Sequence, residues 1–89
     1  MIAKLKYIFQ RFGFDSQVKK LQEEMQELNN AIESDNLNNF LEELVDVYIL
    51  INQFKLNFEN FDEIVDSKIN RTISRIIKQQ YNNEGKYVG

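Results

Sequence analysis

Two short acidic segments carry most of the side chains that could do chemistry in this chain. The first, "EEMQE", spans residues 23–27, and the second, "EELVD", spans residues 42–46 and runs directly into the apolar "VYILI". Carboxylates matter here because the chain has no histidine and no cysteine. Catalytic triads with histidine, zinc sites with histidine or cysteine ligands, and disulfides are therefore excluded. Any reaction must use carboxylates, Lys, Arg, Tyr, Ser or Thr.

The spacing of these carboxylates predicts that they meet. In each segment two of them are three residues apart, so each pair lies on one face of its helix, one turn apart. The pairs are Glu24 with Glu27, and Glu43 with Asp46. Residue 35 lies midway between the pairs, so an antiparallel hairpin that turns near Asp35 should set them level. We then expect Glu24 opposite Asp46 and Glu27 opposite Glu43, in one cluster of four.

A cluster of four carboxylates requires a cation. Like charges held together, some of them in an apolar setting, repel one another and resist ionisation unless a positive charge lies among them. All-oxygen ligation suits a hard divalent cation, so the cluster predicts a Mg²⁺ site with Mn²⁺ as a substitute. Because Mg²⁺ usually keeps water and phosphate oxygens as further ligands, such a site is typical of a phosphorylated substrate.

A solvated helix face is the alternative for the first segment. Glu23, Glu24 and Glu27 lie beside or opposite the apolar positions of their own helix, as surface residues would. Asp46 is harder to explain in this way, since it stands inside the most apolar segment of the chain. Buried aspartates are rare unless they are paired or bind a metal.

A basic stripe follows further along the chain. Its members recur at spacings of three and four, beside the apolar face of their helix. They are Lys68, Arg71, Arg75 and Lys78. Ion pairing at a solvated edge is one interpretation. In a small protein that also has a metal-like carboxylate cluster, the stripe favours phosphate binding, because cations beside Mg²⁺ hold a triphosphate and neutralise developing charge.

Helices must position these side chains. The 89 residues include no proline and only three glycines, which favours an all-α fold of helices joined by short polar turns. Apolar residues recur at helical spacing in four segments. We predict helices over residues 2–12, about 15–34, about 38–57 and about 60–80. The middle two should form a helical hairpin, flanked by the others, in one domain over residues 1–80, and the polar tail 81–89 should be poorly ordered.

Capping residues and apolar stripes refine these helices. The predicted ends are Gly13 after the first helix, Asp15 or Ser16 before the second, Asn39 with Glu42 at the third, and Asn60 or Asp62 at the last. The predicted core stripe of the second helix is Val18, Leu21, Met25, Leu28 and Ile32. In the last helix the inward-facing residues should be Phe61, Ile64, Val65, Ile69, Ile73, Ile76 and Ile77.

The surroundings of the chain can also be predicted. From residue 44 to 51 the third helix is apolar nearly all round, which in so small a chain implies burial against a second subunit, in a dimer or tetramer. There is no signal segment and no apolar run near the roughly 20 residues that span a bilayer. We therefore expect a soluble, cytoplasmic protein that does not bind membranes. A net charge of −3 provides no general attraction to nucleic acid.

The two acidic segments resemble the signature of a known family. Glu23, Glu24 and Glu27, followed after a fifteen-residue spacer by Glu43 to Asp46, look like the EExxE, spacer, ExxD motif of the MazG-like all-α nucleoside triphosphate pyrophosphatases. The downstream "DSKINRTISR" is similar to the Lys/Asn/Arg-bearing helix of that family. The resemblance covers roughly residues 15–78, and the compact chain resembles the stand-alone, phage-type members.

This resemblance implies an oligomeric helical bundle that hydrolyses a (d)NTP to the monophosphate and pyrophosphate with Mg²⁺. It implies that the metal ligands are Glu24, Glu27, Glu43 and Asp46, that Glu23 assists or positions water, and that Lys68, Arg71 and Arg75 hold phosphates. The chain has no tryptophan, so no base-stacking residue can be matched. The candidates for stacking are Phe9, Phe12, Phe14, Tyr48 and Phe54.

Two other functions are compatible with the same residues. A non-catalytic helical bundle could use the apolar stripe from Val18 to Ile32 to bind a partner protein, as an adaptor does. The fold and metal site could also serve another phosphate ester, as in the related phosphoribosyl-ATP pyrophosphatases.

Overall fold

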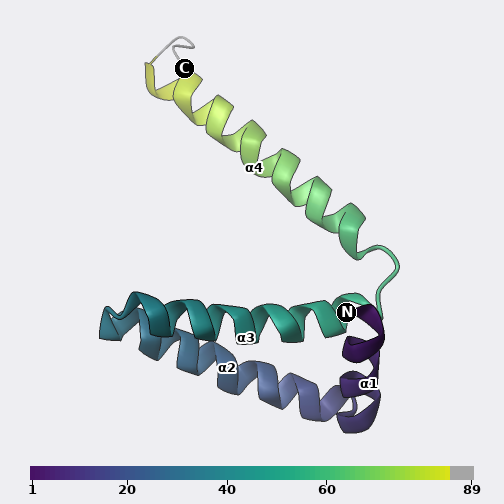
Figure 1. The fold of residues 1–89 in the computed structure, drawn as a ribbon. Coiled ribbons are helices and arrows are strands. Elements are labelled where there is room, and N and C mark those ends of the chain that lie inside the picture. Colours follow the sequence, from purple (N-terminus) through teal and green to yellow (C-terminus); the bar gives the residue numbers. More distant parts are fainter. Residues whose placement is uncertain (85–89) are drawn as a thin grey trace. The chain divides into compact units, whose positions relative to one another are not determined.

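The chain folds into helices, as predicted. The computed structural model describes the backbone of residues 1–84 and the side chains of residues 1–80, and this part contains four α-helices and no strand. They are α1 (Ile2–Phe12), α2 (Phe14–Ser34), α3 (Leu37–Lys55) and α4 (Phe61–Glu84) (Figure 1). The chain divides into two compact units. Met1–Phe58 form the first unit, and α4 belongs to the second.

Gly13 joins α1 to α2. Its φ of 87° lies in the left-handed region, which glycine adopts without a steric penalty. Its N–H donates to the carbonyl of Phe9 (2.8 Å), and its own carbonyl accepts from the N–H of Gln17 (3.1 Å). The same residue therefore ends α1, as predicted, and begins α2. The predicted caps Asp15 and Ser16 are wrong, because α2 already begins at Phe14.

A tight turn joins α2 to α3 at the predicted place. Asp35 adopts the left-handed conformation (φ 58°, ψ 31°), and its N–H donates to the carbonyl of Ile32 (3.4 Å). Asn36 then caps α3, since its side-chain Oδ1 accepts from the N–H of Asn39 (3.1 Å). The predicted cap at Asn39 is wrong by three residues. The two helices run antiparallel, side by side, and the helical hairpin is confirmed (Figure 1).

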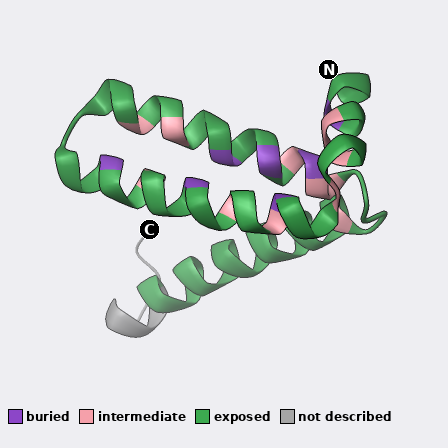
Figure 2. Cartoon of the chain, turned by 90° about the horizontal axis from the view of Figure 1, so that it is seen from below, coloured by how far each residue is buried: buried purple, intermediate pink, exposed green. Residues whose placement is uncertain are grey.

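α2 packs against α3 with a different face from the one that hydropathy predicts. Its buried residues are seven positions apart, and they are Gln17, Glu24 and Ala31. Half-buried leucines lie between them, whereas two members of the predicted stripe, Met25 and Ile32, are exposed. Buried positions follow the facing sides of the two helices (Figure 2). The contact face is therefore rotated towards Glu24, and two of its three buried residues are polar.

α3 has one packed face and one exposed face. Val47, Leu50 and Gln53 are buried, with Glu43 half-buried on the same side. The remaining large apolar residues of its middle part are exposed in the single chain, namely Leu41, Leu44, Val45, Tyr48, Ile49 and Ile51. The nearly continuous apolar surface of α3 thus exceeds what α1 and α2 cover.

Three phenylalanines hold α1 against the hairpin. Phe9 of α1, Phe14 of α2 and Phe54 of α3 meet edge to face, with ring centroids 5.4 to 6.2 Å apart. Edge-to-face contacts of this kind add to the stabilisation from apolar burial. They position α1 beside the open end of the hairpin.

α4 extends further than predicted, to Glu84 rather than to about residue 80, and residues 85–89 of the predicted tail lie outside the described residues. Its apolar residues from Ile64 to Ile77 are exposed within its own unit, and the prediction that they face inward stays a prediction. The exposure arises because α4 is the sole described helix of its unit. No helix within residues 1–84 is both long and apolar enough to cross a membrane.

Candidate metal centre

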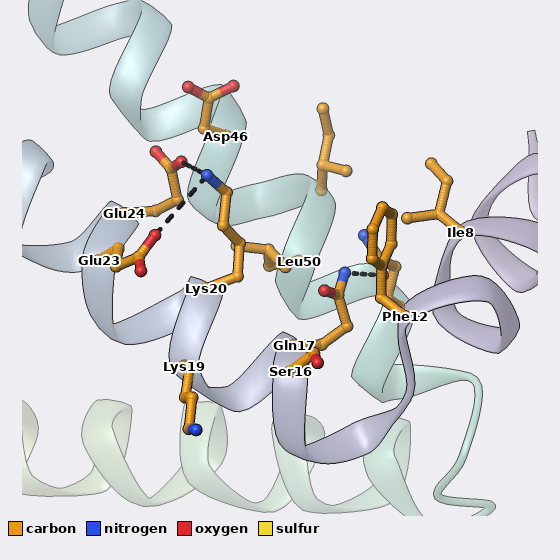
Figure 3. Close-up of a pocket in the computed structure, with 12 residues that line it drawn as sticks. Ile8, Phe12, Ser16, Gln17, Lys19, Lys20, Glu23, Glu24, Asp46 and Leu50 are labelled. Atoms are coloured by element: carbon orange, nitrogen blue, oxygen red, sulfur yellow. Dashed lines mark hydrogen bonds and ion pairs between the residues drawn. The ribbon is translucent and has the colours of Figure 1, made fainter.

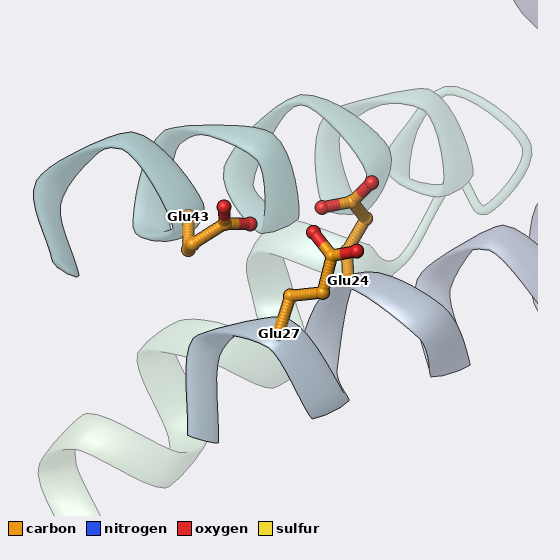
Figure 4. A group of neighbouring side chains, drawn as sticks. All are labelled: Glu24, Glu27 and Glu43. Carbon is orange, nitrogen blue, oxygen red and sulfur yellow. The ribbon is translucent and has the colours of Figure 1, made fainter. Parts of the chain in front are cut away.

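Three carboxylates meet between α2 and α3. Glu24 and Glu27 come from α2 and Glu43 comes from α3, and one oxygen of each lies within 4.8 Å of the other two (Figure 4). The turn at Asp35 sets the two acidic segments level, which is the geometry that the sequence predicts for these three residues. We call them the carboxylate trio.

Two members of the trio place an unpaired oxygen in the protein interior. Glu24 is only 7% exposed, and Glu43 is half-buried. The Oε2 atoms of both are buried and have no hydrogen-bond partner among the described residues. A buried carboxylate oxygen without a partner is unfavourable and rare in native proteins. A hard cation between the helices would satisfy both atoms, and these all-oxygen donors are of the type that Mg²⁺ binds.

The pKa of Glu43 reflects its burial and the repulsion between the carboxylates. Burial raises the pKa of this carboxyl above its ordinary value, and the negative charges of Glu27, Asp46 and Glu24 raise it further. Ionised Glu43 is therefore unfavourable in its folded surroundings when no metal is bound.

Lys20 is a residue of the site that sequence analysis missed. Its Nζ lies 3.1 Å from Oε1 of Glu24 and 3.8 Å from Oε2 of Glu23 (Figure 3). The hydrogen bond to Glu24 and the charge of Glu24 raise the pKa of Lys20. The signal that could have found it is its spacing, because residues four apart on a helix are neighbours.

Asp46 lies beside the trio rather than within it. It is exposed, so the expectation that its apolar flanks bury it is wrong for the single chain. α3 packs through Val47 and Leu50, and Asp46 is rotated about 100° from Val47 around the helix. Its carboxylate nevertheless lines the same cavity as Glu24 and contributes to the raised pKa of Glu43.

A cavity of about 560 Å³ extends from the acidic residues towards α1. Its acidic end contains Glu23, Glu24 and Asp46, and its apolar walls include Ile8, Phe12, Ile49 and Leu50 (Figure 3). A buried pair of glutamines also lines it, in which Nε2 of Gln17 donates to Oε1 of Gln53 (2.7 Å). The volume is in the range of small-molecule sites.

The structure separates the aromatic candidates for base stacking. Phe12 lines this cavity. Phe9, Phe14 and Phe54 pack against one another instead. Tyr48 is exposed on α3 and is not among the lining residues.

The predicted phosphate-binding residues lie on the second unit. Lys68 and Arg71 line a hollow of about 340 Å³ along α4, together with Glu63. Arg75 is exposed one turn further along the same helix. The carboxylates, by contrast, all belong to the first unit.

No family model, curated protein or solved structure matches this chain. The relation to the MazG-like pyrophosphatases is therefore a resemblance in the motif residues.

The trio predicts a measurable pH dependence of metal-free stability. Because its pKa is raised, Glu43 binds a proton more readily in the folded protein than in the unfolded chain. Protonation therefore stabilises the fold fully below the unfolded pKa, and this contribution is lost as the pH rises through the folded pKa. In metal-free buffer at about pH 7, Glu43→Gln should melt at a higher temperature than the wild type.

The difference between Glu43→Gln and the wild type should shrink as the pH is lowered towards about 4. Glu42→Gln is the matched control, since Glu42 is exposed on the same helix. Equal effects of the two substitutions across this pH range would contradict the prediction. Thermal melts followed by circular dichroism provide the measurement.

Proposed function

We propose that this protein is a Mg²⁺-dependent nucleoside triphosphate pyrophosphohydrolase, which converts a (d)NTP and water to the (d)NMP and pyrophosphate. One observation carries the proposal. The carboxylate trio sits at the contact face of a helical hairpin, and buried oxygens of Glu24 and Glu43 have no hydrogen-bond partner within residues 1–80. A fold that only needed stability would favour apolar residues at these positions, because unpaired buried carboxylates are destabilising.

In this proposal Glu24, Glu27 and Glu43 hold the ion. Asp46 adds its negative charge at the rim of the cavity that Glu24 also lines. When bound, Mg²⁺ would neutralise these charges, lower the pKa of a bound water and clamp phosphate oxygens. Mn²⁺ would be a substitute because it accepts the same oxygen ligands.

The remaining roles fall to exposed side chains of the chain. Glu23, which lines the cavity and is largely exposed, would position the attacking water. Attack at the α-phosphorus breaks the bond to the oxygen that bridges to the β-phosphate, and pyrophosphate leaves. Lys68 and Arg71, with Arg75, would bind phosphate oxygens and neutralise the charge that develops on them.

A homo-oligomer is part of the proposal. The exposed apolar residues of α3 and α4 form surfaces of the kind that mark protein contacts, and a second copy of the chain supplies complementary apolar faces. A dimer or tetramer would cover them, and light scattering of the purified protein would measure its mass.

The test of the reaction is a substrate panel. Purified protein should release pyrophosphate from at least one common or modified (d)NTP in the presence of Mg²⁺ or Mn²⁺, and a chelator should stop the release. Product identification distinguishes this reaction from cleavage of phosphoribosyl-ATP, which belongs in the same panel. The protein should also melt at a higher temperature with Mg²⁺ than without it, because a ligand of the folded state stabilises that state.

The exposed apolar face of α3 favours one other function, that of a non-catalytic adaptor. An adaptor should cleave no nucleotide in the panel, and its melting temperature should not respond to Mg²⁺. That combination of results would replace the proposed enzyme with the adaptor.

A further inference from the structure

We propose that Lys20 is an exchangeable cation of the site, which neutralises Glu24 before a metal binds and contacts the phosphates of the nucleotide afterwards. This inference rests on the proposed function, and it assigns a role to a residue outside the predicted signature. Three structural observations carry it: the contact of Lys20 with Glu24, the environment of the two oxygens of Glu24, and the place of Lys20 in the cavity.

The contact places Lys20 in competition with any metal bound by Glu24. The ammonium Nζ lies 3.1 Å from Oε1 of Glu24, while Oε2 is buried without a hydrogen-bond partner in the described part of the chain. A divalent cation that binds Oε1 must displace the ammonium. A divalent cation that binds Oε2 is repelled by the Lys20 ammonium, which lies at the other oxygen of the same carboxylate. Either way, binding of the metal weakens the hold of Glu24 on Lys20.

The carboxylate trio explains why the metal-free site needs this cation. Three carboxylates meet within 4.8 Å, and Glu23 stands next to them in the sequence. Lys20 contacts both Glu24 and Glu23, and so provides one positive charge against the cluster. A divalent cation would supply two positive charges to the cluster. The ammonium of Lys20 would then no longer be needed to neutralise Glu24.

Lys20 can move from the carboxylate to a phosphate without unfolding anything. Its side chain is 53% exposed and has a flexible four-carbon stem. It also lines the cavity between the acidic residues and the apolar walls (Figure 3). A triphosphate bound to the metal would bring its oxygens to this end of the cavity, where an ammonium is a suitable donor.

Lys19 is a matched control for this role. It lines the same cavity and is exposed, yet it forms no ion pair with a described residue. Replacing either lysine with methionine removes one positive charge from the same helix. General electrostatic effects should therefore be similar in the two variants, and only Lys20 should show the effect of direct contact.

The experiment has one arm with metal alone and one with nucleotide. In the first, Mn²⁺ binding to metal-free protein is measured by titration calorimetry. Lys20→Met should bind Mn²⁺ about tenfold more tightly than the wild type, whereas Lys19→Met should change the affinity by less than about twofold. Without metal, Lys20→Met should melt at a lower temperature, because the carboxylates then repel without a counter-ion.

In the second arm, Lys20→Met should raise the KM for the cleaved nucleotide about tenfold at saturating Mn²⁺, while Lys20→Arg, which keeps the charge, should stay near the wild-type KM. The inference is overturned if Lys20→Met binds Mn²⁺ no more tightly than Lys19→Met, or if its KM is unchanged. The first arm uses no nucleotide, so it stays decisive even if the protein cleaves none. Absence of Mn²⁺ binding to every variant would overturn both the metal site and this inference.

Discussion

Glu43→Gln should abolish pyrophosphate release, with a fall in kcat/KM of at least about 10³-fold, while the variant remains folded. Glutamine keeps the size of the side chain but removes the negative charge and one strong metal-ligand oxygen. Glu43 is the one member of the carboxylate trio that α3 supplies, so its loss leaves only ligands on α2. Initial rates across a range of Mg²⁺ concentrations would measure the effect, and circular dichroism would verify the fold.

Glu42→Gln is the matched control for this substitution as well. It removes the same charge from the neighbouring position of α3, where the side chain is exposed, and it should retain activity within about twofold. Full activity in Glu43→Gln would refute the proposed metal centre. The variant should also be more stable than the wild type without metal, so lost activity and gained stability together would identify a position kept for function.

Gln53→Ala should destabilise the protein by about 2–4 kcal/mol, the largest stability effect that we expect from a single polar side chain in this fold. Gln53 is 2% exposed, and its Oε1 accepts a 2.7 Å hydrogen bond from Gln17. Truncation both opens a cavity and leaves the buried amide of Gln17 without its partner. Urea unfolding of the metal-free protein would measure the loss.

A double-mutant cycle isolates the hydrogen bond between these glutamines. Gln17→Leu and Gln53→Leu should each be destabilising, whereas the double variant should cost less than the sum by about 1–2 kcal/mol, because neither amide is then left unpaired. Gln26→Ala is the control, since Gln26 donates a hydrogen bond to Asn30 on the exposed side of α2 and should cost less than about 0.5 kcal/mol. Additive effects of the two leucine substitutions would contradict the assigned pair.

The sequence predicts the helices and the meeting of the acidic segments well, for reasons that are local. Glycine at position 13 and polar residues near position 35 interrupt the helical pattern, so the hairpin and its midpoint follow. Once the turn is placed, helix geometry brings Glu27 level with Glu43. Capping residues are less predictable, because several candidates lie within a few positions and only the three-dimensional turn selects Asn36.

The hydropathy pattern predicts the wrong residues as buried at several positions. Periodicity places Glu24 on a surface face and Met25 in the core, and the structure has the reverse. A hydropathy pattern cannot find a contact face whose central positions are occupied by Gln17, Glu24 and Gln53. Asp46 shows the opposite error, since it lies on the side of α3 away from Val47, among the exposed Leu44, Val45 and Ile49. The family resemblance includes the three carboxylates that meet between α2 and α3, but not Lys20, which lies outside the motif.

The polar residues along the contact face of the hairpin have a consequence for the lifetime of the protein. Gln17, Glu24, Glu43 and Gln53 lie between α2 and α3 beside the apolar contacts of Ala31, Val47 and Leu50, so polar side chains take up part of this contact face. An ion bound by the carboxylate trio would link α2 to α3 and would stabilise the folded hairpin. The unloaded chain would open more often and expose its backbone to proteases. Metal binding would thereby slow the degradation of the protein.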